Sequence, residues 1–390
     1  MLVRGLDWYF VAFKEQFRRG DQGAFELVMF LSLGHFFGIY NPKQLADFLG
    51  IAPQRLYSEL KAWSLYRLKK VLFHFMVKQA AEALRPILAK SAATHSRAGI
   101  TLAVDNSVID RLGRLLRCTW RWYSGRAKKV VNGQELLGIV LTVQGWVFPL
   151  HLLFVSKQGR ANTDKPSLLI SMFKQLVEAF RQEGIDITLF PITLDSWYAS
   201  QDLKHKLHSL GFHKIIVAGK SNYVLTIEGN KQDAASWKKT LKLRQNQWGI
   251  EVPACRKKAL SPTFGKIVVF FYLKRTTKTY YLMDMSQIPL RGAEIRHIWK
   301  QHHLIEWFWK TLKSTFKIKE MRLQQEGLYT GLVIKILAYL LALRLKAQRA
   351  FSKASITQIM RKIQRNYDLQ TLLKQHFHLP YLITPPQNGT

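Results

Sequence analysis

The sequence predicts an α/β protein, with a mixed β-sheet flanked by helices, an all-helical N-terminal region and a β-rich insertion. Three observations predict this class. Residues 1–75 have helical periodicity. From Gly99 on, the pattern changes to strand, hairpin, helix, strand, helix and strand, which is typical of a mixed sheet with helices packed on it. Residues 221–286 contain mostly short β segments.

These patterns divide the chain into five parts. We expect a helical region (1–98), a first part of the α/β core (99–220), a β-rich insertion (221–287), core helices (288–350) and a basic C-terminal segment (351–390).

The helical region contains a segment, residues 41–61, with the layout of a helix-turn-helix. Pro42 can begin the first helix because the N–H that proline lacks would be unpaired there. Gly50 lies at the turn, and Leu56 and Leu60 give the second helix an inward face. An ordinary helical hairpin has the same layout.

The outward face of the second helix carries polar and basic side chains. Gln54, Arg55 and Lys61 lie where a recognition helix reads a DNA groove. We therefore predict that this segment binds DNA, in combination with the charge of the whole chain.

The chain is strongly basic, with 59 Lys and Arg against 25 Asp and Glu and a formal net charge of +34. Like charges at this density repel one another and attract polyanions. Basic residues concentrate in three runs, 111–129, 238–258 and 344–365, rather than in the one amphipathic helix that is typical of membrane-surface proteins. We therefore expect double-stranded DNA as the partner.

The remaining composition favours a soluble, cytoplasmic and nucleoid-associated protein that binds no membrane. The two cysteines, Cys118 and Cys255, cannot make a disulfide framework or a multi-cysteine zinc site. Charge interrupts the N-terminus too early for a secretory signal. The longest apolar stretch, 331–345, has Lys335 in its middle, so we expect a buried helix there.

Two aspartates close apolar strands of the predicted core. Asp105 ends the strand 100–105 and Asp195 ends the strand 186–195. Strand ends are where ligands gather in α/β sheets. Burying two carboxylates together is costly unless a cation such as Mg²⁺ neutralises them. Either aspartate taken alone is equally consistent with a loop cap.

A predicted helix, 295–316, carries a third carboxylate on a polar stripe. Trp299, His302 (or His303), Glu306, Lys310 and Lys313 recur at a spacing of three or four residues and share one helical face. A carboxylate, cations and an aromatic ring together suit a metal ion, phosphates and an unstacked base. An amphipathic helix with a charged outer face has the same pattern.

These residues together resemble the DDE transposases of bacterial insertion sequences. The resemblance rests on Asp105, on Asp195-Ser-Trp-Tyr198 and on a helix reading Trp299-x2-His302-x3-Glu306-x6-Lys313. The cut-and-paste branch of the family carries Y-x2-R-x3-E-x6-K on this helix, so Trp299 stands for Tyr and His302 for Arg. A histidine lacks the bidentate fork of arginine and is charged only near or below a pKa of about 6.5. We therefore expect the phosphate contact of His302 to weaken as the pH rises.

A second stretch of the resemblance is Tyr123-Ser-Gly-Arg126, followed by Lys128 and Lys129. The resemblance spans residues 99–345 and includes the β-rich insertion. It implies an RNase H-like core with a β insertion, preceded by a helical region that grips the terminal inverted repeats, and self-association as a dimer in the DNA complex.

The resemblance also implies the reaction and the residues that perform it. Asp105, Asp195 and Glu306 would hold two Mg²⁺ ions, for which Mn²⁺ can substitute. One ion activates water to cut at the transposon 3′ end, the other stabilises the leaving oxygen, and the freed 3′-OH attacks target DNA. The residues expected to bind DNA are Trp299, His302, Lys310, Lys313, Arg126, Lys128, Lys129, Gln54, Arg55 and Lys61.

Members of this branch commonly free the element through a DNA hairpin, in which an aromatic residue receives a flipped base. The sequence offers four tryptophans for this role without choosing among them: Trp197, Trp237, Trp248 and Trp299.

Two other functions stay open from the sequence. A catalytically decayed or domesticated DNA-binding protein would keep the charge and the helix-turn-helix but need no acidic triad, and the His302 departure favours it. An RNase H-like nuclease or junction resolvase would share the metal site without strand transfer or end-specific binding.

Overall fold

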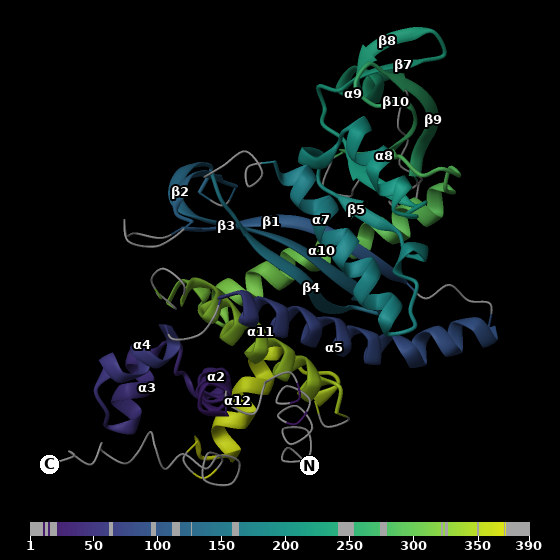
Figure 1. Cartoon of the computed structure of the whole chain (residues 1–390). Coiled ribbons are helices and arrows are strands. Elements are labelled where there is room, and N and C mark those ends of the chain that lie inside the picture. Colours follow the sequence, from purple (N-terminus) through teal and green to yellow (C-terminus); the bar gives the residue numbers. More distant parts are fainter. Residues whose placement is uncertain are drawn as a thin grey trace, which may run out of the picture. The chain divides into compact units, whose positions relative to one another are not determined.

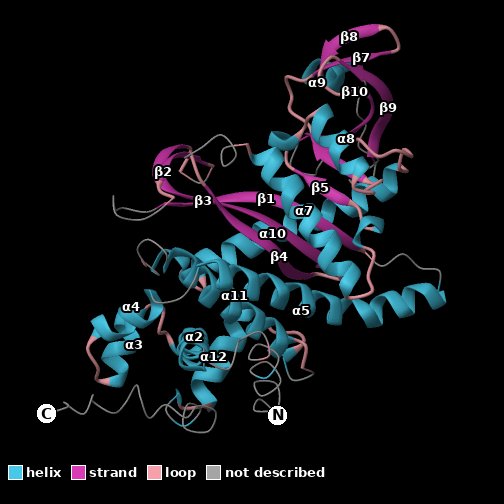
Figure 2. Ribbon diagram, in the orientation of Figure 1, coloured by secondary structure: helices cyan, strands magenta, loops and turns pink. Residues whose placement is uncertain are grey.

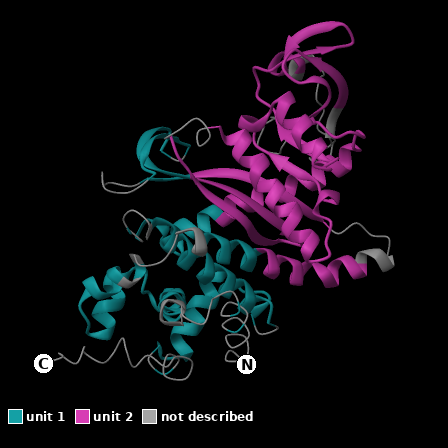
Figure 3. Cartoon of the chain, viewed as in Figure 1, with its two compact units in different colours: residues 1–76, 108–135, 309–390 teal, residues 77–107, 136–308 magenta. Residues whose placement is uncertain are grey.

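The computed structural model describes most of the chain, which forms two compact units (Figure 3). The described residues are 11, 15, 22–61, 65–94, 99–110, 118–125, 127–157, 164–240, 253–273, 279–320, 323, 327–348, 351–369 and 371. Unit 1 comprises residues 1–76, 108–135 and 309–390, and unit 2 comprises residues 77–107 and 136–308.

Unit 2 is built on a mixed β-sheet (Figures 1 and 2). Its order is β3-β1-β5-β6-β11-β10-β9-β7-β8, with β4 paired to β3. Strands β1, β5 and β6 are parallel, whereas β11, β10 and β9 run antiparallel to their neighbours. The predicted α/β class with a mixed sheet is therefore confirmed. The strand bounds are β1 Ile100–Asp110, β3 Lys129–Val143, β4 Trp146–Val155, β5 Ile192–Leu194, β6 Ile215–Ala218, β7 Val224–Ile227, β8 Asn230–Asp233, β9 Pro253–Ser261, β10 Gly265–Leu273 and β11 Thr279–Asp284.

Helices pack on this sheet because each presents an apolar face. On α10, Ile295 and Trp299 are buried in one cluster with Ile216, Phe270 and Leu282 of the sheet. Helices α5 and α10 and strands β1 and β3 run on into unit 1. The helical bounds are α5 Leu65–Thr94, α7 Lys165–Gln182, η3 Ile187–Leu189, η4 Ser196–Tyr198, α8 Gln201–Ser209, α9 Ala234–Thr240 and α10 Gly292–Ser314.

Two strand predictions differ from the structure. Strand β1 does not end at Asp105 but continues to Asp110, because the alternation of buried and less buried side chains persists through Ser107 and Ile109. The expected strand 186–195 is wrong in its first half. There the Asp186 side chain accepts a hydrogen bond from the Thr188 backbone N–H and begins a short helical turn, so only β5 is extended.

The β-rich segment 221–287 joins the core sheet instead of forming a sheet of its own. Strand β11 pairs with β6, with Leu282 opposite Ala218 and Asp284 opposite Ile216. Gly219 follows β6 at a close approach, since a Cβ there would lie 3.0 Å from the Tyr281 Cβ. The β-rich strands therefore extend the sheet that carries Asp105 and Asp195.

Unit 1 is mainly helical. Its elements are α2 Gln22–Gly34, η2 His35–Phe37, α3 Pro42–Leu49, α4 Pro53–Lys61, η5 Ile318–Glu320, α11 Gly327–Lys346 and α12 Ile356–Asn366, and a ribbon of β2 Trp120–Ser124 with the start of β3. Helices α3 and α4 occupy the segment predicted as a helix-turn-helix. The Asn41 side chain caps α3, and Gly50 ends it with a left-handed φ of +67°, a conformation that glycine adopts without strain.

Helix α11 is a buried helix, as its sequence predicted. Among the described residues, Leu328–Lys346 is the one helix long and apolar enough to cross a membrane by length and composition, and 94% of its apolar stretch is buried in the protein. The ammonium of Lys335, also buried, donates a hydrogen bond to the Tyr40 carbonyl at 2.8 Å. This bond satisfies the only charge in the middle of the apolar stretch.

Candidate active site

The register of two parallel strands brings Asp105 and Asp195 together. Val104 of β1 lies opposite Leu194 of β5, so the two aspartates are the next residue on each chain. Neighbouring strands lie about 4.8 Å apart, which places the backbones of the two aspartates side by side. Both side chains are half-buried. Two aspartates that are 90 residues apart in sequence therefore form one acidic pair at the carboxyl end of β5.

Backbone hydrogen bonds orient both carboxylates. Asp105 Oδ1 accepts a hydrogen bond from the Asn106 N–H at 2.8 Å, and Asp195 Oδ1 accepts one from the Ser196 N–H at 2.6 Å. Each bond joins the carboxylate to the N–H of the next residue, so it holds the carboxylate close to its own backbone.

Helix α10 covers the face of the sheet on which the acidic pair lies. Thr193 lies opposite Ile216, which packs beneath α10. Side chains alternate between the faces of a strand, so Asp105 lies on the same face as Ala103, the residue opposite Thr193. The Thr193 hydroxyl is hydrogen-bonded to His302 Nδ1 at 3.0 Å. This bond ties α10 to β5 two residues before Asp195.

His302 and Trp299 are buried against the sheet, which differs from the exposed position expected of DNA-binding residues. The two rings are stacked with their centroids 4.4 Å apart, and both side chains are buried. Burial, and to a smaller extent His303, lowers the pKa of His302 to about 4, although Asp195 and Glu306 oppose the shift. His302 is therefore neutral at pH 7 and cannot hold a phosphate in this arrangement.

Glu306 lies one turn beyond His302 on the same helix. Its side chain is 66% exposed, and its Oε1 atom lies 3.6 Å from His303 Nδ1. Glu306 follows His302 by four residues, so the predicted third carboxylate lies on the same face of α10 as the ring that contacts Thr193. In the described part of the chain, no three His, Cys, Asp or Glu side chains lie close enough together to hold a metal ion.

The acidic pair fits a magnesium ion by its donor chemistry. Carboxylate oxygens at a half-buried strand end are the ligands that Mg²⁺ takes in proteins, and Mg²⁺ commonly completes its shell with water. Asp105 and Asp195 are therefore the described residues that would hold such an ion.

Aromatic residues flank the acidic pair at the ends of β5 and β6. The Tyr198 hydroxyl donates to Asn106 Oδ1 at 3.3 Å, and the Tyr223 hydroxyl donates to the Ser196 carbonyl at 3.0 Å. The Lys220 ammonium lies 4.8 Å from the ring centre of Trp197, which is 73% exposed. Sequence reasoning missed Lys220 and Tyr223, although their position after the next parallel strand was a signal.

Of the other tryptophans considered for a flipped base, two are buried. Trp237 donates its ring N–H to the Leu225 carbonyl at 3.0 Å, and Trp299 is part of the core cluster. Trp248 lies outside the described residues. Trp197 is therefore the one described candidate with an accessible ring.

The other predicted DNA-binding residues lie on several elements. Gln54 is exposed and Arg55 half-buried on α4, while the side chain of Lys61 lies outside the described residues. Lys128 and Lys129 are exposed and Arg126 lies outside the described residues. Lys310 is exposed and Lys313 half-buried on α10. Parts of the three basic runs, 111–117, 241–252 and 349–350, also lie outside the described residues.

Comparison of the sequence with protein-family models and with curated proteins gives no match. The functional interpretation therefore depends on the arrangement of the residues themselves.

Proposed function

We propose that this protein is a DDE-type transposase that binds the terminal inverted repeats of an insertion sequence and catalyses metal-dependent DNA cleavage and strand transfer. The observation that supports the proposal most strongly is the register of β1 and β5, which sets Asp105 beside Asp195 beneath the helix that carries Glu306. The sheet order β4-β3-β1-β5-β6 is compatible with an RNase H-like core.

The proposed reaction assigns separate tasks to the residues around the pair. Asp105, Asp195 and Glu306 would hold two Mg²⁺ ions, or Mn²⁺ in their place. When bound, such ions supply an activated water and neutralise the leaving oxygen of a phosphodiester. The hydrogen bond between His302 and Thr193 joins α10 to β5. It would therefore help to determine how far Glu306 lies from the acidic pair.

DNA would reach this centre through positive charge and through an exposed ring. Lys310 and Lys313 follow Glu306 at four and seven residues, and both carry permanent charges that suit phosphates. Trp197 follows Asp195 by two residues, and its exposed ring with the Lys220 ammonium is suited to stack on an unpaired base. Helices α3 and α4 would bind the end sequence, and two copies of the chain would pair the two ends.

One observation favours a second function, a DNA-binding protein that has lost catalysis. Glu306 contacts His303 rather than the acidic pair, and the buried His302 provides no phosphate contact. Such a protein would bind DNA through the same charge but cleave nothing.

The test is a cleavage assay with the full chain, a DNA substrate carrying paired inverted repeats from the ends of the element, and a target plasmid. The transposase predicts Mg²⁺-dependent cuts at both ends and joined products. Binding of the ends with no cleavage at any Mg²⁺ or Mn²⁺ concentration would establish the DNA-binding protein instead. Cleavage with no joining would indicate a nuclease or resolvase.

A further inference from the structure

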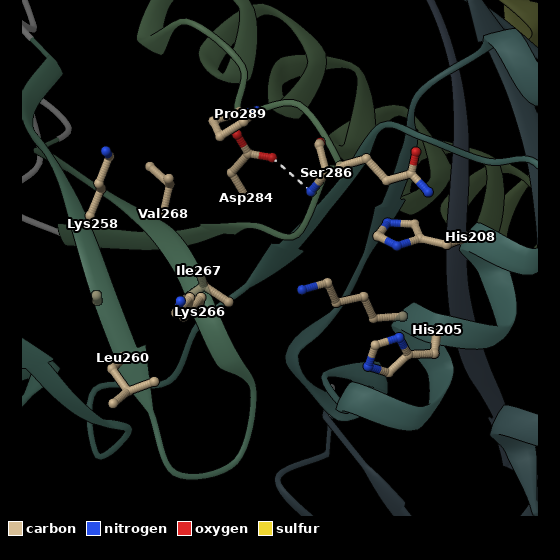
Figure 4. A pocket seen from close by; sticks show the side chains of 13 residues that line it. His205, His208, Lys258, Leu260, Lys266, Ile267, Val268, Asp284, Ser286 and Pro289 are labelled. Carbon is tan, nitrogen blue, oxygen red and sulfur yellow. Dashed lines mark hydrogen bonds between the residues drawn. The ribbon is translucent and has the colours of Figure 1, made fainter.

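A cavity of about 690 Å³ lies in unit 2 between helix α8 and strands β9, β10 and β11 (Figure 4). It is lined by residues other than the acidic pair and the helix over it. Figure 4 shows His205 and His208 on α8 facing the strands that carry Lys258 and Lys266. A cavity of this size is within the range that holds a whole small molecule rather than a single ion.

The lining is strongly cationic. Five of its described residues are basic: Lys204, His205, His208, Lys258 and Lys266. The single carboxylate among the described lining residues, Asp284, already accepts backbone hydrogen bonds from Ser286 at 3.0 Å and from Leu290 at 2.6 Å. Three lysines face this one carboxylate, so the net charge of the described lining is positive.

The strand wall alternates cations with apolar side chains. Lys266 lies opposite Leu260, and Lys258 lies opposite Val268, so the four side chains share one face of the β9–β10 ribbon. Pro289 adds a further apolar surface. A ligand complementary to this wall has an anionic group to pair with the lysines. It also has an apolar or aromatic group to cover the surface between them.

His208 supplies an independent indication of a missing polar partner. Its Nε2 atom is buried and has no hydrogen-bond partner, although the ring belongs to the cavity wall. Burial and the nearby Lys204 lower its pKa, while the Met285 carbonyl opposes the shift. A buried ring nitrogen of this kind is costly to leave unpaired, and the unprotonated nitrogen of a neutral imidazole is satisfied by a donor such as a ligand hydroxyl group.

We infer that this cavity binds an organic phosphate of nucleotide size, with its phosphates on Lys204, Lys258 and Lys266 and its ring against Leu260, Val268 and Pro289. Inorganic phosphate would satisfy the lysines and leave the apolar surface uncovered. Adenosine would cover that surface and leave the charge unmatched. A nucleoside di- or triphosphate satisfies both.

The test measures binding of ATP, inorganic pyrophosphate and adenosine to the full chain by isothermal titration calorimetry at fixed ionic strength and without divalent cations. The variants are Lys204→Gln and Lys266→Gln. Lys206→Gln is the matched control, because Lys206 is on the same helix, is ion-paired with Asp202 and does not line the cavity. We expect saturable ATP binding, pyrophosphate at least about tenfold weaker, and no adenosine binding. Each cavity variant should raise the dissociation constant for ATP about tenfold or more. Lys206→Gln should change it by no more than about twofold.

Several results would overturn the inference. One is the absence of saturable ATP binding. Another is a loss of ATP affinity in Lys206→Gln equal to the loss in the cavity variants, which would reflect attraction to the net charge of the chain. Equal affinities for pyrophosphate and ATP would show that the apolar surface does not contribute to binding. A further result is that duplex DNA competes with ATP and that Lys266→Gln weakens DNA binding as much as ATP binding. The cavity would then be part of a DNA-binding surface instead.

Discussion

The two halves of helix α10 have the same residue spacing and opposite surroundings. In the first half, Trp299 and His302 are buried against the sheet, whereas Glu306 and Lys310 in the second half are exposed. All four belong to one stripe in the sequence. Helical periodicity therefore predicts which side chains share a face, but not how deeply each part of that face is buried.

This difference in burial assigns two roles to the stripe: its first half packs against the sheet, and its second half carries the residues of the proposed reaction. The first half holds α10 on the sheet through the stacked rings and the hydrogen bond to Thr193. The second half carries the carboxylate and the lysines that the proposed reaction needs. Four experiments test this division.

The largest effect is expected from the carboxylates. Under the proposed function, Asp105→Asn, Asp195→Asn and Glu306→Gln should each lower the rate of DNA cleavage at least about 10³-fold, because each removes a negative charge that would hold a metal ion. Binding of end DNA should change little, because the phosphates are neutralised by other residues. Cleavage rates and gel-shift affinities measure the two effects.

Asp202→Asn is the control for this series, because Asp202 is exposed and ion-paired with Lys206 on α8. A Glu306→Gln variant that cleaves at the wild-type rate would show that the exposed half of α10 takes no part in the chemistry.

Trp299→Ala should cause the next largest effect, on stability. The side chain is only 4% exposed within the core cluster, so its removal should lower the free energy of unfolding by about 3–5 kcal/mol. Trp307→Ala removes the same side chain at a position that is 60% exposed and should cost about 0.5 kcal/mol or less. Urea denaturation compares the two. Equal losses would contradict the difference in burial between these two positions of α10.

The pH dependence of stability tests the burial of His302. Its pKa is about 4 in the folded chain and about 6.5 when unfolded, so the unfolded chain takes up the proton first as the pH falls. The stability that depends on neutral His302 is present above pH 6.5 and is lost between pH 6.5 and 4, by up to about 3 kcal/mol.

His302→Gln cannot titrate and can still reach the Thr193 hydroxyl, so it should flatten this part of the stability profile. Denaturation at several pH values gives the difference between the two chains, which cancels the contributions of other buried histidines. His302→Arg should destabilise the chain, in contrast to the gain in phosphate binding expected from the sequence, because it buries a guanidinium. An unchanged profile in His302→Gln would show that His302 titrates in the folded chain as it does when unfolded.

The smallest effect is expected from the lysines after Glu306. Lys310→Gln and Lys313→Gln should each weaken DNA binding and reduce its salt slope by about 1, as expected for one phosphate contact. Lys300→Gln changes the same charge on an exposed position in the first half of the helix and should leave the slope unchanged. Fluorescence anisotropy between 50 and 200 mM salt gives these slopes. Equal slopes for all three variants would assign the effect to the net charge of the chain.

Local patterns predicted much of the fold. The mixed α/β sheet, the two short helices around Gly50 and the buried helix with Lys335 all follow from periodicity, turn residues and composition. The turn at 187–189 was missed because the apolar residues there also suit a strand, and the hydrogen bond from Thr188 to Asp186 decides between them. The function remains a prediction.

The candidate site was predictable in its residues but not in its geometry. The two aspartates could be identified as neighbours because both follow apolar strands. The burial of His302 depends on the rotation and depth of α10 over Thr193, which lies 109 residues away in the sequence. The cavity beside α8 depends on the pairing of Lys258 with Val268 and on the approach of His208, and no local pattern encodes such contacts.

The parallel pairing of β1 with β5 also determines when during synthesis the acidic pair can form. Leu102 and Ile192 are paired across 90 residues, so the ribosome must extend the chain past β5 before Asp105 and Asp195 meet. The further 111 residues to Glu306 take roughly 6–22 s to translate, at about 5–20 residues per second. Both aspartates are therefore synthesised well before the helix that completes the proposed centre. Any DNA cleavage by the proposed centre has to wait until most of the chain has been made.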